Sequence, residues 1–191
     1  MKYHKRIYLT ACILLFSAVC FGQTGNTQIQ VAAQATIPIG DLATSAKVGR
    51  GFAIKGLWGF GSPPQQLTLE AGNNFFALRD KYVVKNVEVS YSNWPIYLGY
   101  RKYINKLYTE SQFGLAINKL VAFSTDTITA SVQQSNAYFA WAGAIGYKLN
   151  DFDLEARYQN ISIKNSPDIR FISLRIAYSL PFFRKKKIET M

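Results

Sequence analysis

The sequence predicts an all-β fold, an eight-stranded antiparallel up-and-down transmembrane β-barrel, and three observations carry this prediction. Segments of about ten residues alternate apolar with polar or small side chains and are separated by turn residues, which is typical of barrels that cross a membrane. The connections between these segments alternate between long and short. Beyond the N-terminus, no apolar stretch is long enough to form a membrane-spanning helix.

Eight strands are expected, at 27–38, 50–60, 66–77, 87–101, 106–118, 136–149, 151–162 and 169–181. The segment 151–162 shows the pattern clearly, because Phe152 and Leu154 share one face while Asp153 and Glu155 share the other. No helix is available to cover the apolar faces, so these faces are expected to meet lipid.

One strand breaks the alternation. Val89 and Tyr91 occupy odd positions in 87–101, whereas Trp94 and Ile96 continue the apolar pattern at even positions. A β-bulge near Asn93 would supply the required slip of one residue, and prolines such as the neighbouring Pro95 are tolerated at bulges.

The connections fall into two classes. Long ones are expected at 39–49, 78–86 and 119–135, with one of moderate length at 164–168, and short ones at 61–65, 102–105 and 150–151. Outer-membrane barrels have long external loops and short periplasmic turns. The segments 40–50 and 119–135 are therefore the expected surfaces for surface ligands or envelope proteins, unless they are plain solvated loops.

Residues 1–22 are expected to be a signal peptide, and 23–191 a barrel with a short basic C-terminal tail. A basic start (Lys2, Lys5, Arg6) precedes a short apolar stretch and small residues suited to cleavage after position 22. An N-terminal membrane anchor and lipoprotein processing at Cys20 are the alternatives.

The residue inventory argues against most catalytic chemistry. Cys12, Cys20 and His4 are the two cysteines and the one histidine of the chain, and all three lie in the expected signal peptide. His-dependent hydrolysis and acyl transfer therefore lack their base, and zinc lacks its preferred ligands. No catalytic site, cofactor or metal is expected, with a Glu70–Glu110 carboxylate pair as the alternative.

A charge network is expected inside the barrel. It comprises Lys55, Glu70, Glu88, Arg101, Glu110, Glu155, Arg157 and Arg175, with Lys148 and Asp153 near one end. An eight-stranded barrel is narrow enough to be filled by its own side chains. Because the two signs balance, the interpretation favoured is a salt-bridged plug, and the alternative is a narrow channel for ions or small molecules.

Aromatic residues mark the expected membrane interfaces. The periplasmic girdle is predicted to contain Trp58, Phe60, Tyr100, Tyr103, Tyr147, Tyr178 and Phe182. The chain as a whole is basic, with 22 Lys and Arg against 11 Asp and Glu. For an exported protein this balance favours outer-membrane lipid as the partner and no nucleic acid.

Three segments carry a family resemblance: IPIGDL (37–42), WPIYLGYRKY (94–103) and LYTESQFG (107–114). Through them the chain resembles the outer-membrane β-barrel domain family, the small eight-stranded barrels of the OmpA/OmpX kind, over roughly 27–183. The resemblance implies a non-enzymatic outer-membrane protein with a structural, envelope or surface-interaction role. A basic tail at 184–187 departs from the usual aromatic C-terminus. A secreted, soluble lipocalin-like ligand-binding barrel is a further alternative. Gly56-Leu57-Trp58 fits the lipocalin Gly-x-Trp motif, but the charges that alternate with a highly apolar face indicate the inverse of an apolar, ligand-holding interior.

Overall fold

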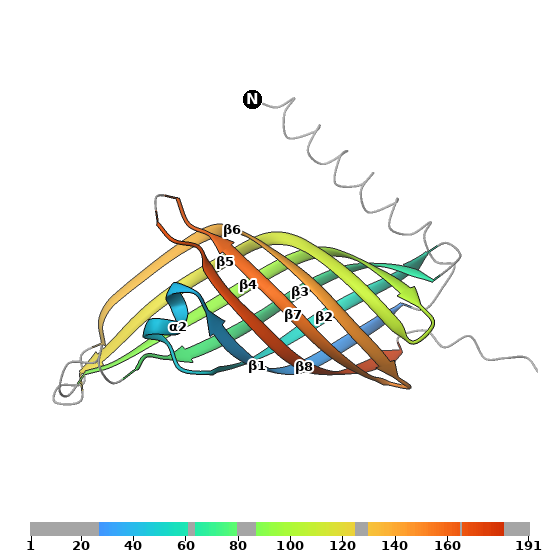
Figure 1. Cartoon of the computed structure of the whole chain (residues 1–191), viewed down its shortest axis with the longest axis horizontal. Helices are drawn as coiled ribbons and strands as arrows, with labels where there is room; N and C mark the ends of the chain where they lie inside the picture. The colour runs from blue at the N-terminus through green and yellow to red at the C-terminus, as the bar shows by residue number, and fades with distance from the viewer. Residues whose placement is uncertain (1–26, 61–63, 80–86, 125–129, 165, 182–191) are drawn as a thin grey trace, which may run out of the picture.

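Eight antiparallel strands close into one barrel, in which every strand pairs with its sequence neighbours and β8 returns to β1 (Figure 1). The computed structural model describes residues 27–60, 64–79, 87–124, 130–164 and 166–181. The predicted fold class is therefore confirmed. The expected signal peptide at 1–22, Phe182 and the basic tail at 184–187 lie outside the described residues.

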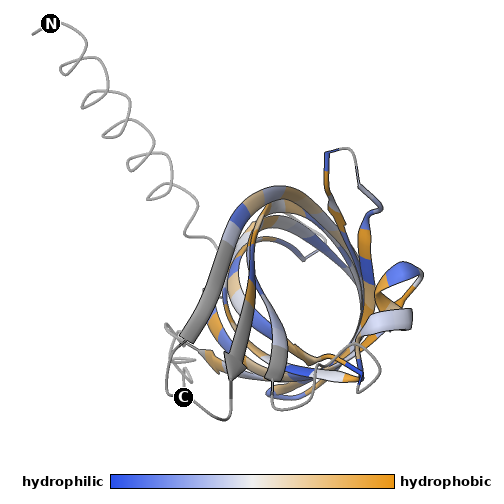
Figure 2. Ribbon diagram, turned by 90° about the vertical axis from the view of Figure 1, so that its left-hand side faces the viewer, coloured by the Kyte–Doolittle hydropathy of each residue, from blue (hydrophilic) through white to orange (hydrophobic). Residues whose placement is uncertain are grey.

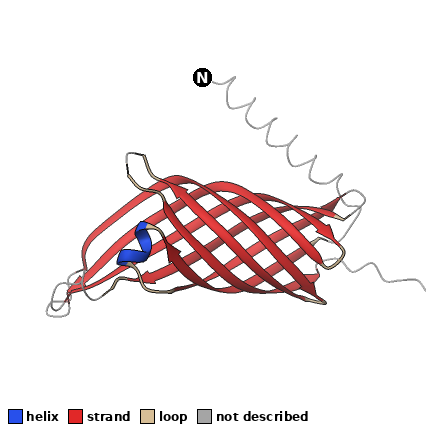
Figure 3. Cartoon of the chain, viewed as in Figure 1, coloured by secondary structure: helices blue, strands red, loops and turns tan. Residues whose placement is uncertain are grey.

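The strands are β1 (Gln28–Ile39), β2 (Gly49–Phe60), β3 (Gln65–Ala77), β4 (Val87–Ile104), β5 (Leu107–Ser124), β6 (Ala130–Leu149), β7 (Phe152–Ser162) and β8 (Ile169–Pro181). A short helix, α2 (Asp41–Ser45), follows β1 (Figure 3). Within the described residues, no helix is both long and apolar enough to cross a membrane.

Two strands run further than the sequence predicts. β5 continues to Ser124 and β6 begins at Ala130, so the predicted loop at 119–135 is wrong over most of its length. Thr, Ser and Gln made this segment look like a solvated loop, yet it also contains β-branched residues that suit a strand. The register between the two strands shifts once, between Val121 and Ala122.

The predicted bulge near Asn93 is also wrong. β4 pairs with β5 without interruption from Val87 to Ile104, and its register with β3 is the same on both sides of Pro95. Tyr91 faces the barrel interior instead and is only 8% exposed. The apolar pattern changes phase because the interior itself becomes aromatic at this height, which removes the need for a slip.

The wall of the barrel has inverted polarity. Large apolar side chains such as Leu98, Phe113, Ile145 and Leu174 are 57–63% exposed on the outside, whereas charged and amide side chains are buried inside. Hydrophobic and hydrophilic positions alternate along the strands, as the view towards the barrel end shows (Figure 2). This alternation follows from the two-residue period of a strand.

The two ends of the barrel differ. At one end, which we call the turn end, β4 and β5 are joined by Asn105-Lys106, and β6 and β7 by Asn150-Asp151. Asn105 and Asn150 have φ values of 59° and 55°, a left-handed conformation that asparagine tolerates better than most residues. The opposite end, which we call the loop end, carries α2 and the connection at 163–168.

Helix α2 folds back against the loop end. The backbone N–H of Arg79 donates to Ser45 O at 2.8 Å, and that of Lys47 donates to Ala77 O at 2.8 Å. These bonds tie the chain after α2 to the end of β3, and Ala46, only 1% exposed, packs into the interior. The segment expected as the open loop 40–50 therefore holds a helix and the start of β2.

Candidate functional site

Six strands bring charged side chains to the barrel axis. The charge network, as the structure shows it, comprises Lys55, Glu70, Arg101, Glu110, Asp153, Glu155, Arg157 and Arg175. None of these residues is more than 4% exposed, and the two signs are equal in number. The two-residue period of the strands accounts for this convergence, because each of these residues occupies an inward position.

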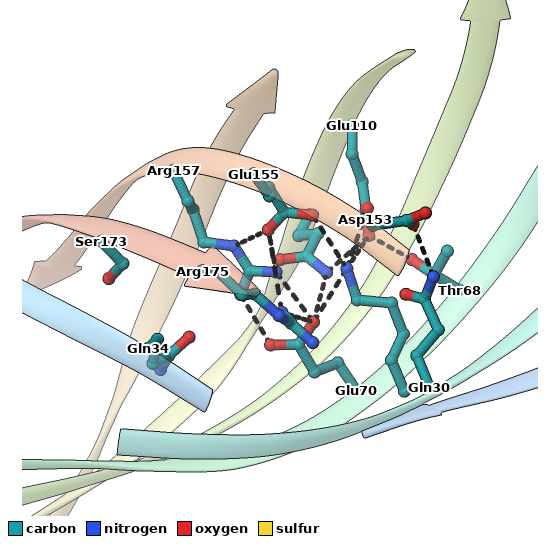
Figure 4. Close-up of polar contacts among 12 residues, drawn as sticks. Gln30, Gln34, Thr68, Glu70, Glu110, Asp153, Glu155, Arg157, Ser173 and Arg175 are labelled. Atoms are coloured by element: carbon teal, nitrogen blue, oxygen red, sulfur yellow. Dashed lines mark hydrogen bonds and ion pairs between the residues drawn. The ribbon is translucent and has the colours of Figure 1, made fainter. Parts of the chain in front are cut away.

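Glu70 on β3 is the centre of the network (Figure 4). Arg157 donates to both Glu70 carboxylate oxygens, from Nη1 at 2.6 Å and from Nη2 at 2.9 Å, in a bidentate pair. Arg175 Nη1 donates to Glu70 Oε2 at 2.8 Å, and Lys55 Nζ lies 3.0 Å from the same oxygen. Three cations from three strands therefore share one carboxylate.

Glu110 holds the network together nearer the turn end. Lys55 Nζ donates to its two oxygens at 3.0 and 2.9 Å, and Arg101 Nε donates to Oε2 at 2.8 Å. Thr68 and Gln112 donate to Oε1 at 2.8 and 2.7 Å. Both carboxylates of the alternative catalytic pair, Glu70 and Glu110, are thus engaged by arginine and lysine side chains.

Arg101 carries the network to the turn end. Its Nη1 donates to Asp153 Oδ2 at 2.9 Å, and its guanidinium carbon lies 3.8 Å from the ring centroid of Tyr108, a cation–π contact. A side chain at Gly146 would collide with the Tyr108 ring, so the glycine makes room for this stack. Lys148 lies further out, part-buried, and donates to Gln28 Oε1 at 3.3 Å.

The charge network carries no net charge, and its cations and anions pair with one another. This pairing offsets the cost of burying the charges. An isolated charge in this position would be very costly, and even a buried pair gains little unless its remaining hydrogen-bonding groups are satisfied. Glu155 illustrates the solution, because it accepts from Arg157 at 2.9 Å, from Arg101 at 3.3 Å and from Tyr108 at 3.0 Å. The arrangement fixes long side chains across the lumen.

Towards the loop end the interior turns apolar. We call this part the aromatic plug; its buried members are Ala46, Phe76, Tyr91, Tyr97, Ala116, Ala140, Ala142, Ile161 and Phe171. The ring centroid of Phe76 lies 5.3 Å from that of Phe171 and 5.7 Å from that of Tyr91. Leu42 of α2 packs against the plug from above. Sequence reasoning missed it, although Phe171 already stood at an inward position in the pattern of β8.

A chain of amides lies beside the plug. Gln34 Nε2 donates to Asn74 Oδ1 at 2.5 Å, Asn74 Nδ2 donates to Asn93 Oδ1 at 3.3 Å, and Asn93 Nδ2 donates to Asn118 Oδ1 at 2.7 Å. Tyr91 Oη also donates to Asn118 Oδ1, at 2.8 Å. Four strands, β1, β3, β4 and β5, are thus linked across the interior by uncharged groups.

Most described members of the predicted aromatic girdle lie on the outer wall, but one faces the interior. Trp58, Tyr100, Tyr147 and Tyr178 are 37–42% exposed on the outer wall, and Phe60 is partly exposed. Tyr103 was wrongly assigned to this girdle, because it shares the inward face of β4 with Arg101 and is only 8% exposed. Its hydroxyl accepts from Arg101 Nη1 at 3.3 Å, and its ring lies 5.4 Å from that of Tyr108.

Glu88 cannot be placed in the charge network. Its side chain lies outside the described residues, and its inward placement depended on the register slip that β4 does not have. Asp153 lies near the turn end, where the sequence placed it beside Lys148, but it is buried and accepts from Arg101 and Gln30.

The outer wall also carries polar side chains, and Asn73 is one that is buried. Asn73 occupies an outward position of β3 between Phe52 and Trp94, yet it is only 9% exposed. The rings of Phe52 and Trp94, on the strands on either side of β3, meet edge-to-face at 6.2 Å between centroids. In the pairing of β3 with β4, Ala71 lies opposite Ile96 and Asn74 lies opposite Asn93. Pro95 lies between these two pairs and has no N–H to donate to β3.

Among the described residues, no cluster of three His, Cys, Asp or Glu side chains could hold a metal ion. The carboxylates that the fold brings together are bridged by arginine and lysine. The arrangement is therefore suited to holding side chains across the lumen.

No protein-family model matches the sequence, and no curated protein matches it significantly. Solved structures do match. The attachment invasion locus protein Ail of Yersinia pestis, crystallised with the heparin analogue sucrose octasulfate, shares 16% identity with a TM-score of 0.56, over 81% of this chain and 97% of Ail. The N-terminal β-barrel domain of Pseudomonas aeruginosa OprF shares 12% identity with a TM-score of 0.55, over 82% of this chain and 100% of that domain.

Neisserial surface protein A shares 14% identity with a TM-score of 0.50, over 83% of this chain and 99% of that protein. At such low identity the likeness concerns the fold alone, and it extends over nearly the whole of each matched chain. Together with the closed eight-strand topology and the inverted polarity, it shows that this chain has the fold of the small eight-stranded outer-membrane β-barrels.

Proposed function

We propose that this protein is a non-enzymatic outer-membrane β-barrel whose interior is plugged and whose loop end makes its external contacts. The single observation that carries the proposal is the inverted polarity, with a neutral, fully buried charge network inside a wall of exposed apolar side chains. A soluble barrel would reverse this arrangement, because its apolar residues would fill the interior. The lipocalin-like alternative is therefore disfavoured.

The aromatic residues support a membrane position. Trp58, Tyr100, Tyr147 and Tyr178 lie on the outer wall towards the turn end, where an amphipathic ring gains from the boundary between lipid and water. On this proposal, with an even number of strands, the turn end faces the periplasm and the loop end faces outwards.

Two barriers in series support a plug over a channel. The charge network crosses the lumen on the turn side, and the aromatic plug crosses it on the loop side. A conducting path needs continuous access for water, whereas Arg101, Arg157, Phe76 and Phe171 are each at most 1% exposed.

The first experiment tests the class of protein. The full chain is expressed in a Gram-negative host, and its envelope is fractionated. We expect the protein in the outer membrane, and we expect unboiled and boiled samples to run differently on a gel. A single mobility together with recovery in the soluble periplasmic fraction would contradict the proposal.

The second experiment tests the plug. Purified barrel is inserted into planar bilayers, and the current is recorded. We expect no stable unitary conductance. Reproducible steps would instead support the narrow-channel alternative.

The proposed external contacts favour an anionic partner. At the loop end, Lys47, Arg79, Lys164 and Arg170 are exposed, against the described acidic residues Asp41 and Asp168. Ail, which shares the fold, was crystallised with the polyanion sucrose octasulfate. Binding to immobilised heparin is expected to weaken with salt and in the variant Lys164→Glu, whereas Lys102→Glu at the opposite end should have no effect. Equal loss in both variants would contradict a loop-end site.

A further inference from the structure

Four residues of neighbouring strands carry five buried polar atoms that have no hydrogen-bond partner among the described residues. They are Gln34 Oε1, Thr36 Oγ1, Gln159 Oε1, Arg175 Nε and Arg175 Nη2. Their residues are 7%, 0%, 0% and 2% exposed, so bulk water does not reach them. Buried polar groups in proteins are nearly always paired, and an unpaired cluster indicates a bound partner that the side chains themselves do not supply.

Strand pairing brings the four residues together. Gln34 is the direct neighbour of Arg175 across β1 and β8, and Thr36 is the neighbour of Ser173 in the same ladder. Gln159 on β7 joins them because its Nε2 donates to Ser173 Oγ at 2.9 Å. Figure 4 shows Gln34 and Ser173 on one side of Arg175 and Glu110 on the other.

The donor and acceptor types decide the ligand. Nε2 of Gln34 donates to Asn74 and that of Gln159 donates to Ser173, so the unpaired atom of each amide is its carbonyl oxygen. Arg175 contributes two N–H donors, because only its Nη1 is bonded, to Glu70. An anion would be repelled by the two carbonyl oxygens, and a cation by the guanidinium. Water donates and accepts at once and suits all five atoms.

We propose that Gln34, Thr36, Gln159 and Arg175 form an internal binding site for ordered water. The water accepts from Arg175 and donates to the carbonyl oxygens of Gln34 and Gln159. It thereby joins the charge network to the amide chain that begins at Gln34, and it makes one hydrogen-bonded system that spans the barrel. Phe171 of the aromatic plug lies on the loop side of the site, and Glu70 of the charge network lies on its turn side. The bound water is therefore separated from the solvent at both ends of the barrel.

The test is a crystal structure of the detergent-purified full chain, with some crystals soaked in sodium bromide. Water peaks are expected at about 2.7–3.2 Å from Arg175 Nε and Nη2 and from both carbonyl oxygens. Bromide found at Arg175 by anomalous scattering would overturn the assignment in favour of an anion site. Direct pairing of Gln34 or Gln159 with Arg175, with no density between them, would overturn it in favour of a dry interior.

A matched pair of variants gives a second readout in solution. Thr36→Val removes the hydroxyl while keeping the shape, and Thr36→Ser keeps the hydroxyl. In detergent micelles, NMR transfer of magnetisation from water to the Arg175 Nε–H is expected in the original protein and in Thr36→Ser, and is expected to fall at least two-fold in Thr36→Val. Equal transfer in both variants, or none in the original protein, would contradict the site.

Discussion

Replacing Glu70 by Gln should destabilise the barrel by about 3–5 kcal/mol, the usual cost of removing one partner from a buried ion pair. The change keeps the shape of the side chain but leaves the interior with an unbalanced positive charge. Arg157 and Lys55 retain Glu155 and Glu110 as partners, at 2.7 and 2.9 Å. Arg175 retains only Glu155 at 3.7 Å, so most of the cost arises at Arg175.

The assay is urea unfolding in lipid vesicles, followed by the gel mobility of unboiled samples. The double variant Glu70→Gln/Arg175→Met restores neutrality, so its loss of stability should fall short of the sum of the single losses by about 1–3 kcal/mol. Asp41→Asn, an exposed acidic residue on α2, serves as the control and should change little. A cost below about 1 kcal/mol for Glu70→Gln, or strict additivity in the double variant, would refute the closed network and point to a solvated lumen.

Three further changes test the wall and the turns by the same urea assay. Trp94→Ala should expose the amide of Asn73 to lipid and cost about 1–3 kcal/mol, and it should cost less when Asn73 is already alanine. Gly146→Leu should cost about 1–3 kcal/mol because the new side chain meets the Tyr108 ring. Asn105→Ala should cost about 1 kcal/mol because of its φ of 59°, whereas Asn105→Gly should not destabilise; equal effects of the two would contradict this reason.

The inward and outward faces could be read from the sequence because the two-residue period leaves only two choices for each strand. Once Asp153, Glu155 and Arg157 share a face, the apolar face of β7 follows, and the same holds for β8. The closed eight-strand topology was predicted on this basis together with the alternating connections. The pattern does not predict which charged side chains pair across the lumen, such as Arg157 of β7 with Glu70 of β3. Strand order alone does not determine how far, or in which direction, a long side chain extends inside the barrel.

The errors have one physical origin. Inferring from the sequence which positions of a strand face inward assumes that inward residues are polar, and the aromatic plug violates this assumption at Tyr91 on β4. Under that assumption, a bulge near Asn93 is needed to keep Tyr91 on the outer face. The prediction for Tyr103 is wrong for a related reason. It assumes that an aromatic residue near a strand end faces lipid, although Tyr103 lies two residues from Arg101 and therefore faces the interior with it. The polar composition of 119–135 likewise predicts a loop, although most of this segment belongs to the extended ends of β5 and β6.

The two barriers differ in chemistry, and this difference has a consequence for the proposed closed state. The charge network is held by electrostatic attraction in a poorly solvated space, so it responds to a change of a single charge. The aromatic plug is held by packing and responds to lost volume. Glu70→Gln weakens one barrier and Phe171→Ala the other, and each leaves the second barrier intact across the lumen. Neither change alone should therefore produce conductance in planar bilayers, and their combination, which weakens both barriers, is the variant in which a current is expected first. A current in either single variant would show that one barrier, not two in series, closes the barrel.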